Sequence, residues 1–210
     1  MSIEAGEFRK LFPQKNVSVI LIALLNAGST LQKQTPTEWE NSLTRRLHKR
    51  LIRIYPFRDG PLSIQLQPEI PSLYQGPKPL SGKIDLLVPS NLGYQVYFAI
   101  EVKRLRYISP NGRFVPGNSN YVNDGMMRFI SGQYAPLSQT GAMLGYVFDG
   151  DIDATRDGIN DYIQTKVNEL KIRPPKKLIK STIVNDNPID ETNHDIENRL
   201  FTIYHIFLSV

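Results

Sequence analysis

Three charged side chains in the middle of the chain have the types and spacing for chemistry on a phosphate. Asp85 lies in the apolar run 84–88, and Glu101 and Lys103 lie in or just past the next run, 95–102. Magnesium prefers oxygen ligands and usually takes only one or two carboxylates from a protein, which leaves room for water and a phosphate. A lysine beside such a pair can stabilise negative charge that develops at phosphorus. The three side chains are therefore suited to attack on a phosphodiester.

The elements that position them are predicted to be two strands of a hairpin. Both runs are short, rich in Val, Ile, Tyr and Phe, and separated by the turn-forming residues 89–94. Side chains alternate faces along a strand, so Glu101 and Lys103 share a face, and Asp85 lies opposite Glu101 or one diagonal step away, about 5–8 Å between Cβ atoms. The other face carries an apolar row predicted to face the core: Val96, Phe98, Ile100 and Val102.

Ile84-Asp85 and Glu101-Val102-Lys103 resemble the motif of the PD-(D/E)XK, or restriction-endonuclease-like, nucleases, with Ile84 where the family name has Pro. The order and spacing of elements extend the resemblance over most of residues 35–150. It implies that Asp85, Glu101 and the Val102 carbonyl bind Mg²⁺, with Mn²⁺ able to substitute, and that Lys103 orients the attacking water. The alternative reading of the same residues is a salt-bridge ladder on a half-exposed sheet.

The resemblance implies a metal-dependent endonuclease that hydrolyses DNA and leaves a 5′-phosphate. RNA stays open as a substrate because the chemistry is the same. The order of elements is also similar to nuclease domains of bacterial defence systems, so a defence or mobile-element role, a homodimer, or a place in a larger defence complex are further expectations. The alternative function is a catalytically inactive subunit of the same fold that binds nucleic acid or acts as a scaffold.

A helix ahead of the hairpin supplies a candidate third acid. Thr35, Pro36 and Glu38 form a predicted capping box, and the apolar residues that follow are spaced by four: Trp39, Leu43, Leu47 and Leu51. Glu40 borders the core-facing side of this helix, and the resemblance implies that such an acid joins the catalytic and metal-binding set. An ordinary acid in the first turn, favoured by the helix dipole, is the alternative.

Further candidates are predicted to touch substrate. Arg45, Lys49 and Arg53 form a stripe at i, i+4 and i+8, which suits either phosphate contacts or a solvated helix face. By resemblance, Arg128 and Gln133 of a helix predicted at 120–134 lend polar groups to the site. In the same way Glu69, in a strand predicted at 61–70, is a possible additional metal ligand.

Composition sets the outer bounds. The chain has 210 residues, no cysteine and a formal net charge of +5, which excludes disulfide or cysteine chemistry and suits an anionic partner. No apolar run is long enough to span a bilayer, so no membrane partner is expected and a cytoplasmic location is the default.

The predicted fold is a single α/β domain over residues 1–210, with a mixed sheet of about five strands and helices on both faces. It comprises a helical segment 1–56 that includes a buried helix at 16–27, a catalytic core 57–150, and a C-terminal part 151–210. In the core, 142–148 is expected to be a buried strand. The C-terminal part is expected to hold a helix capped by Asp153, then strands 178–184 and 200–208 joined by a polar loop.

Overall fold

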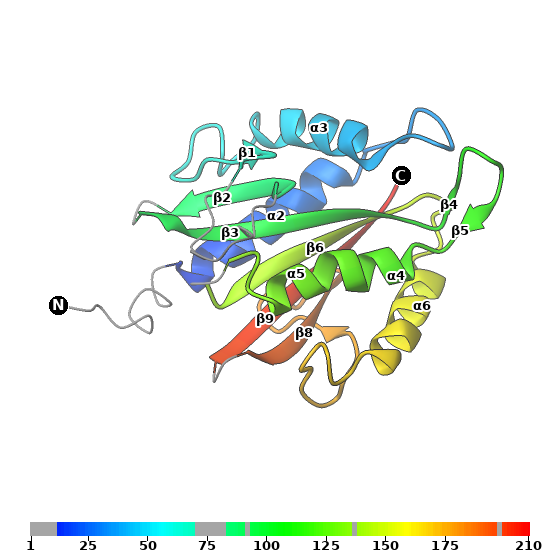
Figure 1. The fold of residues 1–210 in the computed structure, drawn as a ribbon. Coiled ribbons are helices and arrows are strands. Elements are labelled where there is room, and N and C mark those ends of the chain that lie inside the picture. The colour runs from blue at the N-terminus through cyan, green and yellow to red at the C-terminus, as the bar shows by residue number, and fades with distance from the viewer. Residues whose placement is uncertain (1–11, 70–82, 91–92, 136–137, 197–198) are drawn as a thin grey trace.

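A seven-stranded mixed sheet forms the centre of the computed structural model, which describes residues 12–69, 83–90, 93–135, 138–196 and 199–210 (Figure 1). Its strands are β1 (Gln65–Leu66), β2 (Leu86–Ser90), β3 (Gly93–Leu105), β6 (Thr140–Val147), β7 (Ile179–Lys180), β8 (Ile189–Ile196) and β9 (Arg199–Ser209). Their order is β1-β2-β3-β6-β9-β8-β7. The central β3, β6 and β9 are parallel, and the pairs on either side are antiparallel. A separate ribbon pairs β4 (Tyr107–Ile108) with β5 (Phe114–Val115).

The predicted α/β class and mixed sheet are confirmed, but the strand count of about five is wrong. The main reason is β8, which occupies the segment expected to be a polar loop. Four of its polar residues, Asp190, Glu191, Thr192 and His194, are buried and have partners. Asp190 accepts a hydrogen bond from Arg156 at 2.6 Å, and Thr192 bonds both His194 and His205 at 2.8 and 2.9 Å. Buried polar groups with partners are tolerated in a sheet, and this pairing is invisible in the sequence.

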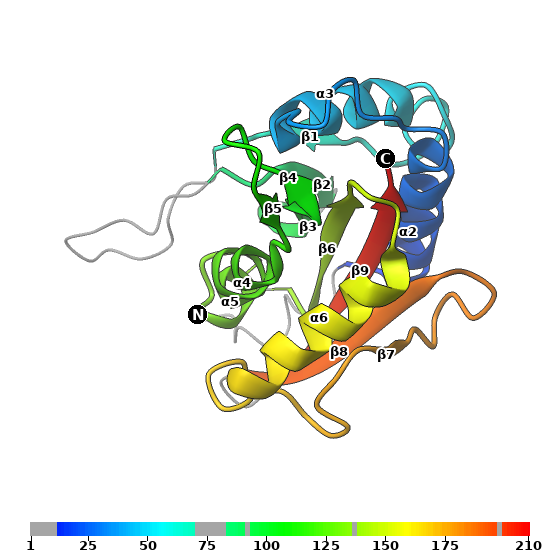
Figure 2. The ribbon, with the colours of Figure 1, turned by 90° about the vertical axis from the view of Figure 1, so that its right-hand side faces the viewer.

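Two helices cover one face of the sheet, α2 (Gln14–Gly28) and α3 (Glu40–Leu51) (Figures 1 and 2). The helix predicted at 16–27 is confirmed as α2. Leu24 of α2 and Leu43 and Leu47 of α3 belong to one core with the predicted apolar row of β3, of which Phe98, Ile100 and Val102 are fully buried.

Helices also cover the opposite face, where Glu101 and Lys103 point. They are a continuous helical segment of α4 (Asn118–Tyr121), the π-helical turn η1 (Val122–Met126) and α5 (Met127–Ile130), together with α6 (Ile152–Thr165) (Figure 2). Tyr97 and Ala99 of β3 share a second core with Tyr121 and Phe129 of these helices. The acidic face of the hairpin is therefore buried, which a solvated ladder of salt bridges would not be.

Two predicted helix starts are wrong. α3 begins at Glu40, with Trp39 in the N-cap position and no side-chain cap, so Thr35 and Glu38 form no capping box. Glu38 instead accepts hydrogen bonds from the Gln34 amide at 2.6 Å and from Arg46 at 2.7 Å. α6 is capped by Asp151, which accepts from the Ala154 amide at 3.0 Å, and not by Asp153. Glu38 is thus taken up by other contacts and α3 has no side-chain cap, whereas in α6 a neighbouring acid two residues earlier makes the local capping bond.

Two remaining predictions concern the strand at 61–70 and the N-terminal segment. The strand predicted at 61–70 is reduced to the two residues of β1 plus a bridge between Glu69 and Lys83. Residues 1–11 of the predicted N-terminal helical segment lie outside the described part of the chain. Within that part, no helix combines the length and apolar character needed to cross a bilayer.

Candidate active site

The carboxylate of Glu101 is the most deeply buried group of the candidate site. Glu101 lies in β3, its residue is 1% exposed, and one oxygen, Oε1, accepts from Lys103 Nζ at 2.5 Å and from Arg128 Nη1 at 3.0 Å. The other oxygen, Oε2, is buried without a hydrogen-bond partner among the described residues. Burial raises the pKa of Glu101, and the charges of Lys103 and Arg128 oppose that rise. A buried oxygen with no donor is costly, which indicates that something else satisfies it.

Lys103 occupies the position that strand alternation predicts. Two residues beyond Glu101 on β3, it turns to the same face and its Nζ also donates to the Val102 carbonyl at 3.1 Å. The residue is only 9% exposed. Taking an ammonium group out of water is costly unless an anion pairs with it, and the carboxylate of Glu101 does so.

Asp85 reaches the same place from the other strand of the hairpin. It lies one residue before β2, where Leu86 pairs with Ile100, and its Oδ2 accepts from the Val102 amide at 2.8 Å. Burial and the negative charge of Glu101 raise the pKa of Asp85 to about 7, against the opposing effect of the Val102 hydrogen bond. The predicted proximity of Asp85 to Glu101 is thus present, and it has an electrostatic cost.

Glu40 joins these groups from α3. As the first residue of the helix it accepts from the Arg104 backbone amide at 3.1 Å, so the N-terminus of α3 is joined to β3 one residue past Lys103. Burial raises the pKa of Glu40, Lys103 opposes the rise, and the charge of Asp85 adds to it. The structure therefore brings the predicted third acid into electrostatic contact with Asp85 and Lys103.

The helix α5, which covers the second face of the sheet, contributes a basic residue to the site. Arg128 of α5 contacts Glu101 and also donates to the Tyr134 hydroxyl at 2.5 Å, and that hydroxyl donates to the Lys83 carbonyl at 2.7 Å. This links α5 to the start of the hairpin. Gln133, the other candidate on this segment, is half-buried and is not among the residues that line the adjoining cavity.

An open cavity of about 360 Å³ adjoins the buried carboxylates. Three residues of the candidate site also line this cavity: Glu40, Lys103 and Arg128. A ligand in the cavity would therefore contact one acidic and two basic side chains of the site. The remaining lining residues are Trp39, Arg104, Tyr107, Asn120 and Asp124.

The acidic donor set fits a hard cation in its chemistry. All of its donors are oxygens, from Glu40, Asp85, Glu101 and the Val102 carbonyl, and the free Oε2 of Glu101 is an unused acceptor. As the side chains stand, however, no group of three or more His, Cys, Asp or Glu in the described ranges is arranged to ligate one ion. Hydrogen bonds from Val102, Lys103 and Arg104 engage the acids instead.

The other predicted residues lie apart from this group. Arg45, Lys49 and Arg53 are exposed on α3 and just after it, and within the described residues no side-chain hydrogen bond or ion pair engages them. Glu69 is exposed and pairs with Lys83 at 3.6 Å, and neither hydrogen bond nor ion pair joins it to the buried acids in the described structure.

Sequence reasoning missed three residues beside the site: Trp39, Arg104 and Tyr134. Arg104 directly follows the acid-x-Lys motif, and alternation along β3 was enough to place it on the face opposite Lys103, toward α3. Tyr134 left no signal, because its contact depends on how α5 packs against the hairpin. Trp39 was assigned to the core by its helical spacing, yet it is 64% exposed.

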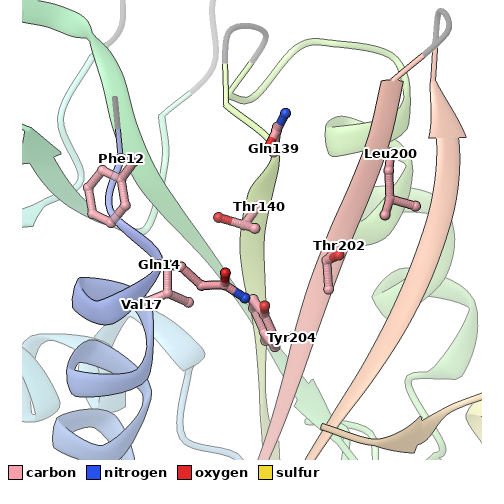
Figure 3. Close-up of a pocket in the computed structure, with 8 residues that line it drawn as sticks. All are labelled: Phe12, Gln14, Val17, Gln139, Thr140, Leu200, Thr202 and Tyr204. Atoms are coloured by element: carbon pink, nitrogen blue, oxygen red, sulfur yellow. The ribbon is translucent and has the colours of Figure 1, made fainter. Parts of the chain in front are cut away.

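A second cavity of similar volume, about 360 Å³, lies near the amino-terminal ends of β6 and β9 and the start of α2 (Figure 3). Among the described residues its lining is apolar or uncharged. Its lining residues are Phe12, Gln14, Val17, Gln139, Thr140, Leu200, Thr202 and Tyr204.

Comparisons of this chain with protein-family models, with curated proteins and with solved structures find no match.

Proposed function

We propose that this chain is a metal-dependent nuclease of the restriction-endonuclease-like type, which hydrolyses phosphodiester bonds of DNA with Mg²⁺ as its cofactor. The observation that carries the proposal is the convergence of Glu40, Asp85, Glu101 and Lys103, of which Glu40 and Lys103 line one cavity, with Oε2 of Glu101 buried and without a partner among the described residues. A sheet surface seldom gathers one buried and two partly buried acids around a buried lysine unless the group has a use.

The acids would hold the cofactor. Asp85, Glu101, Glu40 and the Val102 carbonyl supply the oxygens, and their raised pKa values reflect repulsion and burial that a cation would relieve. Bound Mg²⁺ supplies Lewis-acid polarisation of a phosphoryl oxygen and a water of lowered pKa.

The basic side chains act on the substrate directly. Lys103, which lines the cavity, is placed to orient the attacking water and to stabilise charge on the phosphorus. Arg128 also lines the cavity, and its guanidinium is held by Glu101 and Tyr134, so it can donate to a phosphate oxygen without further ordering.

One observation favours a second candidate, a non-catalytic subunit that binds nucleic acid. Glu101 is already neutralised on Oε1 by both Lys103 and Arg128, an arrangement that also suits a purely structural ion cluster. The two candidates differ in a single measurable property, turnover in the presence of a divalent cation.

The test incubates the purified full chain with supercoiled plasmid in Mg²⁺, in Mn²⁺ and in EDTA. We expect nicked or linear product with either metal and none in EDTA. Asp85→Asn and Glu101→Gln should abolish cleavage, because each removes a ligand without changing shape. Asp157→Asn, which removes an exposed carboxylate on α6, serves as the matched control and should cut normally. Cleavage in EDTA, or by Asp85→Asn at the wild-type rate, would refute the proposal.

A further inference from the structure

The only tryptophan of the chain stands exposed at the mouth of the candidate active site. Trp39 is 64% exposed, directly precedes Glu40, and lines the same cavity as Glu40, Lys103 and Arg128. Exposing a large aromatic surface to water is unfavourable, and single exposed apolar residues are common on proteins. Position distinguishes this one, because it is the residue next to a buried acid of the site.

The indole ring also packs on a neighbouring cation. The guanidinium of Arg104 lies between two rings, 4.5 Å from the Trp39 ring centre and 4.1 Å from that of Tyr107. Tyr107 in turn packs edge-on against Phe148, with ring centres 6.2 Å apart. Arg104 is fixed by donating to the Glu38 carbonyl at 3.0 Å. One face of Trp39 therefore packs on this column, and 64% of the residue remains exposed to solvent.

The surroundings of the ring suit a nucleotide. Single-stranded nucleic acid is bound by aromatic side chains on which bases stack, next to cations that contact the backbone. Here Lys103, Arg104 and Arg128 lie around the same cavity as the ring, and the whole chain carries a net charge of +5. Inside a duplex both faces of a base are covered by its neighbours, so away from the two ends only an unpaired base offers a face to an aromatic platform.

We propose that Trp39 stacks an unpaired nucleobase beside the scissile phosphate, so that the substrate is single-stranded DNA or a strand with unpaired nucleotides. This inference rests on the proposed nuclease function for the identity of the site. Arg104 and Tyr107 are positioning residues that hold the ring at the mouth of the cavity.

The test reads the tryptophan itself. Because the chain has one tryptophan, its emission reports on Trp39 alone. The full chain is titrated in Ca²⁺, which permits binding with little hydrolysis, with an oligothymidylate and with a blunt duplex of equal length. We expect the single strand to quench the emission and the duplex to leave it nearly unchanged. Absence of quenching by the single strand, or equal quenching by the duplex, would overturn the inference.

Variants measured by anisotropy of a labelled oligonucleotide give a second readout. Trp39→Leu should weaken single-strand binding roughly tenfold, and Trp39→Phe, which keeps a stacking ring, by about two- to threefold. Tyr55→Leu changes a ring of similar exposure, 66%, outside the cavity and should bind as the wild type. Wild-type affinity of Trp39→Leu for the single strand would overturn the inference even if Trp39→Phe behaves as expected.

These readouts separate the inference from the proposed function. Quenching together with no cleavage in Mg²⁺ would support stacking and reject hydrolysis. Cleavage of plasmid in Mg²⁺ without quenching would reject stacking and leave hydrolysis standing.

Discussion

At the scale of the residue, the unusual property of Asp85 is its pKa of about 7, against an ordinary value of 3.8. The native chain therefore keeps this proton to a higher pH than the unfolded chain does. Stability conferred by the protonated form is lost as the pH rises from about 4 to about 7, because over that range the unfolded state binds fewer protons than the native state.

The first prediction follows from this loss of stability with rising pH. In EDTA at pH 8, Asp85→Asn should melt above the wild type by roughly 2–8 °C, because it removes a buried charge that the wild type must ionise. The difference should shrink toward pH 4. Thermal melts at the two pH values check this, with Asp157→Asn as a control that should show no such trend. A wild type that is as stable as Asp85→Asn at pH 8 would contradict the burial of an ionised acid.

The second prediction concerns the chemical step at Lys103. Lys103→Met keeps the bulk and removes the charge, so the single-turnover cleavage rate should fall by about 10²–10³-fold, the usual loss of one group that stabilises the transition state. Binding to DNA in Ca²⁺ should change little. Lys180→Met on β7 is the exposed control. An equal loss of rate and binding would make Lys103 a phosphate contact instead.

At the scale of the element, two neighbouring glutamates at the start of α3 have separate roles. Glu38 is 8% exposed and binds Arg46 and the Gln34 amide, whereas Glu40 faces Arg104 and the site. The sequence predicted the separation but assigned Glu38 to a cap that does not form.

The third prediction compares the two. Glu38→Ala should destabilise the chain by about 1–3 kcal/mol, because it leaves a largely buried arginine and an amide without their acceptor, and cleavage by the folded fraction should stay near normal. Glu40→Gln should spare stability and slow cleavage, with a deficit that shrinks at high Mg²⁺. Chemical denaturation and a Mg²⁺ titration of the rate distinguish the two effects. Normal cleavage by Glu40→Gln at limiting Mg²⁺ would remove Glu40 from the site.

The junction between the β4–β5 ribbon and α4 passes close to the backbone of Arg104. Gly117 has φ of 80°, and a Cβ there would come within 2.4 Å of the Arg104 carbonyl oxygen. Gly112 has a similar φ of 77° with nothing within 4 Å. The two glycines share the backbone conformation and differ only in the close approach.

The fourth prediction uses them as a matched pair. Gly112→Ala should cost about 1 kcal/mol from the left-handed conformation alone, and Gly117→Ala about 2–4 kcal/mol because backbone must also move. Gly117→Ala should in addition reduce the ssDNA affinity, since it displaces Arg104 beneath Trp39. Denaturant unfolding measures the first effect and anisotropy the second. Equal costs at the two sites would mean that the chain relaxes freely around Arg104.

At the scale of the whole molecule, the excess positive charge should appear as salt-dependent binding. Arg45, Lys49 and Arg53 are exposed and unpaired within the described residues, which leaves their charges available to phosphates.

The fifth prediction is that the affinity of the inactive Asp85→Asn protein for DNA falls steeply with salt, because bound phosphates release counterions. Reversing the charges of Arg45, Lys49 and Arg53 to Glu should flatten the slope by up to about 2–3 in the logarithmic plot. The control reverses three exposed lysines that precede the edge strand β7: Lys171, Lys176 and Lys177. This change should leave the slope unchanged. An unchanged slope after the first reversal would make that stripe a solvated face.

Short-range pattern was enough to predict the elements that hold the site. Alternation along 95–103 put Glu101 and Lys103 on one face, and turn residues at 89–94 predicted the hairpin, although β2 extends to Ser90 and β3 begins at Gly93. Spacing by four predicted the buried side of α3 at Leu43, Leu47 and Leu51 with Glu40 at its border, but not the exposure of Trp39. These inferences hold because side-chain direction within a strand or helix depends on backbone geometry alone, and that geometry is local.

Only the tertiary structure decided which groups are buried and what each one contacts. The packing of α4, α5 and α6 on the second face made Glu101 a buried acid, gave it Arg128 as a partner and left its Oε2 without one. The same kind of long-range pairing turned the polar segment 189–196 into a buried strand and left Trp39 exposed on its supporting column. Local periodicity predicted which faces are apolar, but the burial and the partners of polar groups depend on residues far apart in the chain and therefore could not be read from it.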